Sequence, residues 1–433
     1  MEYYRSYYTE ALELSKTLPD EQSELYKRHF IPLPLEQFAE RIENAGGGEE
    51  DILLSTLAKS AFENLNIKFD VLFGSTRHIT NSADCIKIVD ASDITEEHVS
   101  KKLFKSGDDK MVAFIHAHAR RIVFIDVPDG MAVDINLLFA NSDIPLSTQV
   151  LVQVGREARL NLFEWYASKS NSISLMSILH EIKVGEYGKA DVNMVHNEDQ
   201  NTFVVNFSKG QVLENGLLNI NYIYNGGIGS RAKNQVSTTG YQARSNVIEL
   251  VLGSGKQKFD LSTIISNVGN NTLSGLESKA ALTDESVCIL KGFADVGENA
   301  KGSRSFVNER GILLDKRCYM SSIPGMSIKN SDVKATHSSA TMPVDEEALF
   351  YLMSRGATKA VAQKLLIAGF LSSSIAKMEN PAVKVAVSSL MQEKINNKRF
   401  GTVPALDISN LWGDANAQTD DMFQGHYKYR ELK

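Results

Sequence analysis

Apolar residues near both ends of the chain recur at the spacing of amphipathic helices. Over residues 1–66 they follow one another three or four positions apart, which predicts helices. The same spacing returns over residues 345–400, where Gly356 suits a helix C-terminus and Pro381 suits a helix start. We therefore expect helical segments on both sides of a centre with a different pattern.

The centre of the chain carries short apolar runs separated by Gly, Asn, Ser and Asp, which is typical of β-strands. The runs occupy residues 122–127, 149–154, 160–166, 191–195, 203–207, 217–223, 247–252, 259–265, 287–290 and 312–314. The stretch 172–182 fits a helix or a strand. A centre of this length exceeds most sandwiches and barrels, whereas a β-solenoid adds one rung per ~20 to 25 residues without limit. The pattern predicts a parallel β-helix.

These patterns divide the chain into four parts. They are an N-terminal helical and mixed domain (1–110), a parallel β-helix core (111–344), a C-terminal helical domain (345–400) and a polar tail (401–433). The expected fold class is mainly β with flanking α-helices. Because the tail is polar, we expect it to be loosely held.

Charge and cysteine content narrow the possible functions. The net charge of −7 argues against nucleic-acid binding, which usually needs a basic surface. No apolar run is long enough to span a bilayer, and the first residues do not resemble a signal peptide, so we expect a cytoplasmic protein without membrane contact. Three cysteines and no CxxC motif argue against a disulfide framework, a structural zinc site or a four-cysteine cluster.

Cys318 and His337 are the candidate metal ligands. They stand 19 positions apart in a strand-rich segment. Thiolate and imidazole suit soft or borderline metals, including those of iron–sulfur clusters. Lys316 and Arg317 directly precede Cys318 and should lower the pKa of its thiol; the alternative is a buried structural cysteine. On a β-helix the two ligands could lie one rung, ~5 Å, apart and contact one metal. Further ligands would then come from a partner chain.

Two other motifs favour structural interpretations. His116 and His118 alternate on a segment that we interpret as a strand, which would place both on one face. No third ligand lies nearby in the sequence, so structural or surface roles are favoured over a metal site. The glycine-rich segment 226–231 lacks the GK[ST] of a P-loop and fits a turn, so the sequence shows no ATPase motif of its own.

Three segments near the C-terminal end resemble a known family. They are the run from Asp332 to His337, the LFYLMSRG helix from Leu349 to Gly356, and the pair Gly369-Phe370. Together they resemble the SufB/SufD family of iron–sulfur cluster assembly proteins. The resemblance covers about residues 110–400 and is most specific over 345–370.

The resemblance implies a right-handed parallel β-helix flanked by helical domains. It implies pairing through the β-helix end with a second SufB/SufD-type subunit, in a homodimer or a heterodimer, and a C-terminal domain that docks a SufC-type ABC ATPase. Cys318 and His337 would be ligands of a transient iron–sulfur cluster at the dimer interface. Flavin binding is implied by the resemblance alone, since no flavin motif is visible. The residues expected to shape the ATPase dock are Phe350, Tyr351, Arg355, Gly356 and Phe370.

The chain departs from the family pattern around His337. Thr336 and Ser338 stand where B-type members carry glutamates, and Ala335 stands where D-type members usually carry a cysteine. We expect a D-type or undifferentiated member that is a scaffold and not an enzyme. One alternative is a structural adaptor of the same complex that holds no cluster. The other is a carbohydrate-active β-helix enzyme, whose paired carboxylates and secretion signal are not visible.

Overall fold

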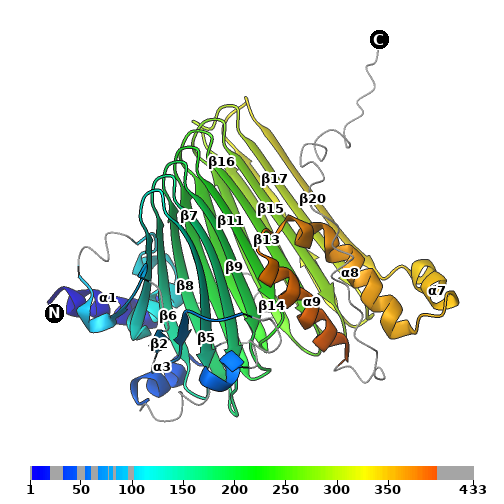
Figure 1. Cartoon of the computed structure of the whole chain (residues 1–433), viewed down its shortest axis with the longest axis horizontal. Coiled ribbons are helices and arrows are strands. Elements are labelled where there is room, and N and C mark those ends of the chain that lie inside the picture. Colours follow the sequence, from blue (N-terminus) through cyan, green and yellow to red (C-terminus); the bar gives the residue numbers. More distant parts are fainter. Residues whose placement is uncertain are drawn as a thin grey trace.

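A computed structural model describes residues 2–19, 33–45, 54–59, 67–76, 78–80, 84–95 and 102–396. In this part of the chain the backbone winds into two facing sheets, and each turn of the chain adds one strand to each sheet (Figure 1). Neighbouring strands are parallel except at the N-terminal edge, where β1–β2 and β3–β4 are antiparallel. The predicted parallel β-helix is confirmed. The polar tail expected at 401–433 lies outside the described residues.

The two sheets are named A and B, and each runs from the N-terminal to the C-terminal end of the β-helix. Sheet A contains, in spatial order, β2 (His78–Thr80), β1 (Val71–Phe73), β5 (Ala132–Asn141), β7 (Arg159–Ser168), β9 (Lys189–Asn197), β11 (Leu217–Tyr224), β13 (Arg244–Gly253), β15 (Leu273–Leu282), β17 (Arg304–Leu313) and β20 (Lys334–Pro343). Sheet B contains, in the same direction, β3 (Ile86–Asp90), β4 (Arg121–Val127), β6 (Leu146–Val154), β8 (Ser174–Val184), β10 (Thr202–Val212), β12 (Gly229–Thr238), β14 (Lys258–Asn267), β16 (Val287–Val296), β18 (Tyr319–Ser322) and β19 (Gly325–Ile328).

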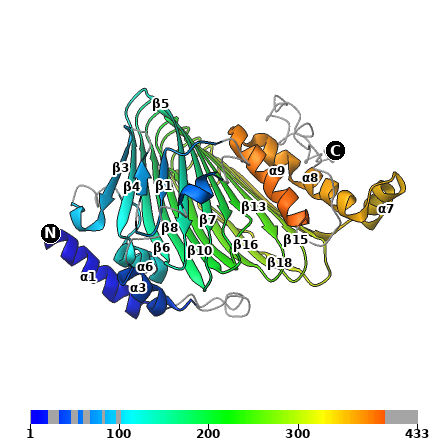
Figure 2. The ribbon, with the colours of Figure 1, turned by 60° about the horizontal axis from the view of Figure 1, so that its bottom comes forward.

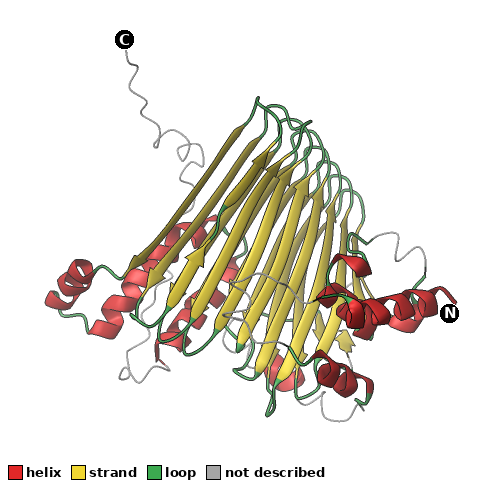
Figure 3. Cartoon of the chain, turned by 180° about the vertical axis from the view of Figure 1, so that it is seen from behind, coloured by secondary structure: helices red, strands yellow, loops and turns green. Residues whose placement is uncertain are grey.

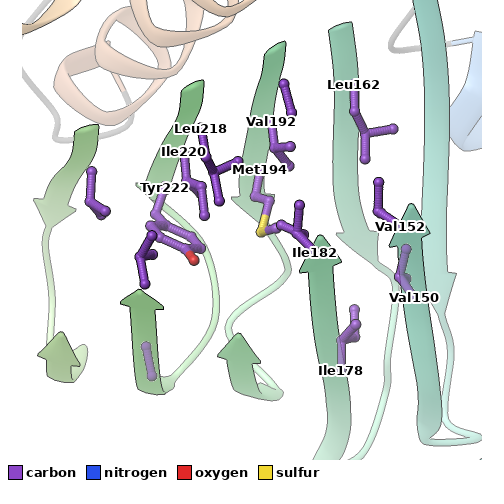
Figure 4. Packing of buried hydrophobic residues seen from close by; sticks show 14 of the residues in the cluster. Val150, Val152, Leu162, Ile178, Ile182, Val192, Met194, Leu218, Ile220 and Tyr222 are labelled. Carbon is purple, nitrogen blue, oxygen red and sulfur yellow. The ribbon is translucent and has the colours of Figure 1, made fainter. Parts of the chain in front are cut away.

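Side-chain alternation along each strand builds the interior of the β-helix. Val192 and Met194 of β9 share this interior with Ile182 of β8 and Tyr222 of β11 (Figure 4). The same buried cluster continues from β1 to β18. Removal of this apolar surface from water is the main force that holds the two sheets together.

Each rung is longer than the sequence predicted. Equivalent corner residues have a positive φ, and their numbers differ by 30, 28, 27 and 29: Glu157, Tyr187, Asn215, Gln242 and Asn271. The prediction of ~20 to 25 residues per rung is therefore wrong. Most strands from β5 to β17 contain nine to eleven residues instead of four to seven. Buried polar residues interrupt their apolar runs, so each run marks only part of a strand.

N-terminal helices cover one end of the outer face of sheet B. They are α1 (Glu2–Thr17), α3 (Leu35–Glu43) and α6 (Lys110–His118), with short 3-10 turns η1 (Ala91–Asp93) and η2 (Ser106–Asp108). Figures 2 and 3 show this group beside the first strands of the β-helix. Phe38, Ile42 and Phe114 from the helices pack with Leu179 of β8 and Phe207 of β10.

The predicted strand at His116 and His118 is wrong, because both residues belong to α6. The carboxylate of Asp109 accepts a hydrogen bond from the Met111 backbone at 2.7 Å and starts the helix. All residues of α6 from Met111 to His118 are buried, so the segment shows no amphipathic pattern from which a helix can be recognised. Residues two apart on a helix do not share a face, which removes the expected pairing of the two histidines.

C-terminal helices cover the outer face of sheet A. The predicted helices are confirmed as α7 (Glu346–Ser354), α8 (Lys359–Lys377) and α9 (Pro381–Asn396). Ile367 and Leu371 of α8 and Val387 of α9 pack in one cluster with Leu250 of β13. A partly buried ion pair joins Lys377 of α8 to Glu277 of β15, with 2.5 Å between Nζ and Oε2. No helix among the described residues is long and apolar enough to cross a membrane.

Candidate functional site

Among the described residues, nothing covers the last rung at one end of the β-helix. It consists of β18 and β19 on sheet B and β20 on sheet A. Strand β20 forms the edge of its sheet, and nine of its ten residues are exposed. A long exposed edge presents backbone N–H and C=O groups to another chain. This end is the candidate functional site.

Several side chains of the last rung point into the interior of the β-helix. Ser339 of β20 donates a hydrogen bond to Ser322 of β18 across the interior, with 2.7 Å between the hydroxyl oxygens. Since side chains alternate along a strand, His337 also lies on the inward side of β20. Cys318 directly precedes β18 and belongs to the interior core together with Met320. We call Cys318, Ser322, His337 and Ser339 the lumen mouth.

Cys318 is a buried thiol, with 7% of the residue exposed. The thiol donates to the backbone carbonyl of Asp315 at 2.8 Å. Burial raises the pKa of the Cys318 thiol above its ordinary value. The prediction that Lys316 and Arg317 lower this pKa is wrong. The guanidinium of Arg317 pairs instead with Asp315 at 3.0 Å and with Glu285 at 3.1 Å.

His337 lies at the same end but on the opposite sheet. Ser322 faces Ser339, so Cys318, four residues before Ser322, is level with Pro343, four residues after Ser339. Six residues along β20 separate that level from His337, which corresponds to roughly 20 Å. The expectation that Cys318 and His337 lie one rung apart is therefore wrong. Within one chain the two residues do not reach a common metal ion.

A column of mostly polar side chains runs through the interior to the lumen mouth. The sequence alone did not reveal it. On sheet A the register aligns Glu164, Met194, Tyr222, Glu249, Ser278, Glu309 and Ser339. On sheet B it aligns His180, Ser208, Asn234, Thr263 and Gly292. All except Ser339 are buried. A polar residue repeated in the middle of apolar runs, once per rung, is the signal that could have revealed the column.

Hydrogen bonds connect the two sides of this column. Glu164 pairs with His180 at 3.0 Å and accepts from the Tyr166 hydroxyl at 2.6 Å. Farther along, Glu249 accepts from Asn234 at 3.2 Å and from Ser278 at 2.6 Å. Burial raises the pKa of Glu249, and these hydrogen bonds offset part of that effect. The column is therefore a set of paired polar groups within an otherwise apolar interior.

Glu309 is the last carboxylate of the column before the lumen mouth. It is fully buried. The hydroxyl of Ser322 donates to its Oε2 atom, and Ser322 in turn accepts from Ser339. Burial raises the pKa of Glu309 above its ordinary value. The hydrogen bond from Ser322 and the nearby backbone of Gly292 and Ile323 act on this pKa in the opposite direction. Two hydroxyls thus connect a buried carboxylate to the exposed end.

The predicted partner-binding residues lie in two different environments. Phe350 is 73% exposed and Tyr351 57% exposed on α7, the helix farthest from the sheets in Figures 1 and 2. The guanidinium of Arg355 lies 5.2 Å from the centre of the Tyr351 ring, and Gly356 ends the helix with φ +93°. Phe370 of α8 is partly buried against sheet A. The Lys279 ammonium lies 5.3 Å from the centre of the Phe370 ring.

The described residues contain no group of three or more His, Cys, Asp or Glu side chains placed to hold a metal ion. A metal at the lumen mouth would therefore need ligands of another kind or from another chain. Cys288, which aligns with Met320 of β18, is fully buried in the core.

Comparison with known proteins identifies the family. Residues 138–370 match the family model described as "SUF system FeS cluster assembly, SufBD core domain". The SufB protein of Bacillus subtilis is 26% identical over 375 residues, which cover 84% of this chain and 77% of that protein. The SufD protein of the same organism is 22% identical over 311 residues, 70% of this chain and 71% of that protein. Both relatives are named as iron–sulfur cluster assembly proteins.

A SufBD family protein of Staphylococcus saprophyticus is 25% identical over 256 residues, 57% of this chain and 54% of that protein. The family model alone spans more than half of the chain, from within β5 through β20, and includes the whole region from the LFYLMSRG segment to Gly369-Phe370. The resemblance seen in the sequence is confirmed: the chain belongs to the SufB/SufD family of iron–sulfur cluster assembly proteins.

Proposed function

We propose that this chain is a non-enzymatic scaffold subunit of an iron–sulfur cluster assembly complex. A nascent cluster is built between two β-helix ends, and Cys318 and His337 are its ligands. The observation that carries the proposal is the uncovered last rung, where a thiol and an imidazole line the inward face beside a ten-residue exposed edge. These are ligand types that iron–sulfur clusters take.

The positions of the two ligands suit a pair of subunits. Cys318 is level with Pro343, and His337 lies six residues away on β20. In a two-fold pairing about an axis near Ala340, the partner's His337 would lie over Pro343, at the level of Cys318 and across the interior from it. Such an isologous interface brings together ligands that are distant within each chain. The partner is a second copy or a related SufB/SufD-type subunit.

The C-terminal helices are the proposed dock for a SufC-type ABC ATPase. Phe350 and Tyr351 are large apolar side chains exposed together on α7, and such groups on a protruding helix are typical of partner contacts. Phe350→Ala with Tyr351→Ala should weaken ATPase binding by at least about tenfold, since hot-spot aromatics each contribute about 1–2 kcal/mol. Calorimetric titration measures this loss, and an unchanged melting temperature shows that the fold is intact.

Anaerobic reconstitution tests the scaffold role. The purified chain is incubated with ferrous iron and sulfide, and cluster formation is followed by visible absorption and iron content. Wild type should develop a chromophore that Cys318→Ala and His337→Ala lose. Cys288→Ala is the matched control, because this second buried thiol lies in the core one rung beneath the mouth, in register with Met320. A chromophore that persists in Cys318→Ala contradicts the proposed ligand role.

One alternative has a specific observation in its favour. The described residues supply no three-residue metal site by themselves, which suits an adaptor that binds the ATPase and holds no cluster. Absence of a chromophore in wild type, together with retained ATPase binding, would favour this adaptor over the scaffold.

A further inference from the structure

The two carboxylates nearest the end of the polar column have different surroundings. Both oxygens of Glu249 accept hydrogen bonds, Oε1 from Asn234 and Thr263 and Oε2 from Ser278. In Glu309 the Oε2 atom accepts one from Ser322, while Oε1 has no hydrogen-bond partner of normal geometry among the described residues. A buried carboxylate oxygen without a donor is unfavourable and calls for a specific reason.

The backbone leaves room for this carboxylate. A Cβ atom added to Gly292 would lie 2.7 Å from Oε1 of Glu309. On the preceding rung of sheet B the register places Thr263 at the same level as Gly292. The polar column therefore loses a side chain at Gly292, and the carboxylate of Glu309 occupies the space. A side chain at position 292 would displace it.

His337 lies on the same inward face as Glu309. Glu309 is in register with Ser339, and Val307 is in register with His337. Glu309 and His337 are thus diagonal neighbours on adjacent strands, with Cα atoms about 7–8 Å apart. Side chains at that separation can contact one ion between them. Cys318 lies farther away, since four residues along the strand, or about 13 Å, separate it from Ser322 alone.

The ligand set at this position consists of oxygen and nitrogen atoms. A carboxylate, an imidazole and two hydroxyls suit a divalent first-row transition cation. We propose that the lumen mouth holds a ferrous ion, with Glu309 and His337 as its protein ligands and the hydroxyls of Ser322 and Ser339 beside it. This inference rests on the proposed function and deepens it. It separates a position that holds iron from the thiol of Cys318, where sulfur chemistry would take place.

Ferrous-ion binding in the absence of sulfide tests the inference. The full chain is dialysed anaerobically against Fe²⁺, and bound iron is measured for wild type, Glu309→Gln and the matched control Glu249→Gln. Glu309→Gln should bind iron at least about tenfold more weakly than wild type, in the range seen when metal sites are altered. Glu249→Gln should bind as wild type does. Gly292→Ala is a second variant, which keeps Glu309 but displaces its carboxylate and should also lose iron.

Cobalt substitution identifies the ligands. Co²⁺ bound by carboxylate and imidazole lacks the intense near-ultraviolet band of a thiolate complex, so the wild-type and Cys318→Ala spectra should agree. The inference is overturned if Glu309→Gln binds Fe²⁺ as tightly as wild type, if wild type binds none, or if a thiolate band disappears in Cys318→Ala. Failure of the proposed function looks different, because reconstitution would then give no chromophore while the Glu309-dependent iron binding remained.

Discussion

The two ends of the β-helix differ in the length and exposure of their last strands. At the first end the sheets close with the three-residue β2 and the five-residue β3, both antiparallel to their neighbours, and β1 beside them is buried at every residue. At the last end the ten-residue β20 is almost entirely exposed. Short edge strands offer little backbone for pairing between chains, whereas a long exposed edge invites it. The first end carries short edge strands, whereas the second offers the long edge that the proposed pairing with a second subunit needs.

The interiors of the two ends differ as well. Near the first end, aromatic rings follow one another from rung to rung, with Phe73 5.5 Å from Phe139 and Phe139 5.0 Å from Tyr166 between ring centres. Near the last end, the interior holds Glu309 and the lumen mouth. The polar column, which contains the Glu164–His180 pair next to these rings, thus reaches the exposed surface at the last end. The contrast links the uncovered edge to the family's role in iron–sulfur cluster assembly.

The largest effect is expected at the closed end. Phe73 of β1 is 2% exposed and packs on Phe139, with the Arg121 guanidinium 5.4 Å from the centre of its ring. Phe73→Ala leaves a cavity and should lower the free energy of unfolding by about 3–5 kcal/mol. Urea denaturation measures the change. A loss below about 1 kcal/mol would mean that β1 does not seal the first end.

The next largest effect is expected from blocking the exposed edge. The backbone N–H groups of Lys334 and Val344 donate to carbonyls of the preceding rung, and alternate residues of a parallel strand share this direction. Thr341 therefore points its N–H to the open edge, where proline would remove a donor without breaking the bonds to β17. Thr341→Pro should weaken subunit pairing more than about 100-fold, equivalent to about 2.7 kcal/mol, as measured by sedimentation velocity.

Thr341→Val is the control for this substitution, because it changes the same side chain and keeps the N–H. It should pair as wild type does. Pairing of Thr341→Pro at wild-type strength would show that β20 is not the interface, and the comparison of the two ends would lose its functional meaning.

The sequence predicted those elements whose local pattern agrees with their environment. The C-terminal helices are half exposed, and Asp345, Gly356 and Pro381 mark their ends, so their periodicity and caps were visible. Strand length was not visible, because buried polar residues such as Ser208 of β10 end the apolar runs before the strands end. Helix α6 is buried on every side and therefore carries no amphipathic signal.

The candidate site was predictable in composition but not in geometry. Cys318 and His337 both lie at the lumen mouth, as the motif suggested, yet the 19 positions between them cross from sheet B to sheet A. Sequence spacing does not encode that crossing. Glu309 taken by itself gave no signal, because a single glutamate in a strand normally faces solvent. Only the register shows that it faces inward beside Gly292.

An intermediate effect on stability is expected from a residue between the two ends, on the outer face of sheet A. Burial raises the pKa of Asp191 on β9 from 3.8 to about 6. Since the folded-state pKa lies above the unfolded value, stability is greatest below about pH 4 and falls as the pH rises to about 6. Asp191→Asn should remove this decline and stabilise the chain by up to about 3 kcal/mol above pH 6.5. Thermal melts of both proteins from pH 4 to 8 measure it, and parallel curves would contradict it.

The smallest effect on the free energy of unfolding is expected for two serines of the polar column, one inside and one at the open end. Ser278 is buried and donates to Glu249 at 2.6 Å, so Ser278→Ala leaves a buried carboxylate oxygen without its donor and should cost about 1–2 kcal/mol. Ser339 aligns with the same column through Glu309 but is exposed, and water can replace its hydroxyl. Ser339→Ala should change stability by less than about 0.5 kcal/mol. Equal losses in urea denaturation would mean that the lumen mouth is as closed as the interior, whereas unequal losses would show that the column opens there to solvent.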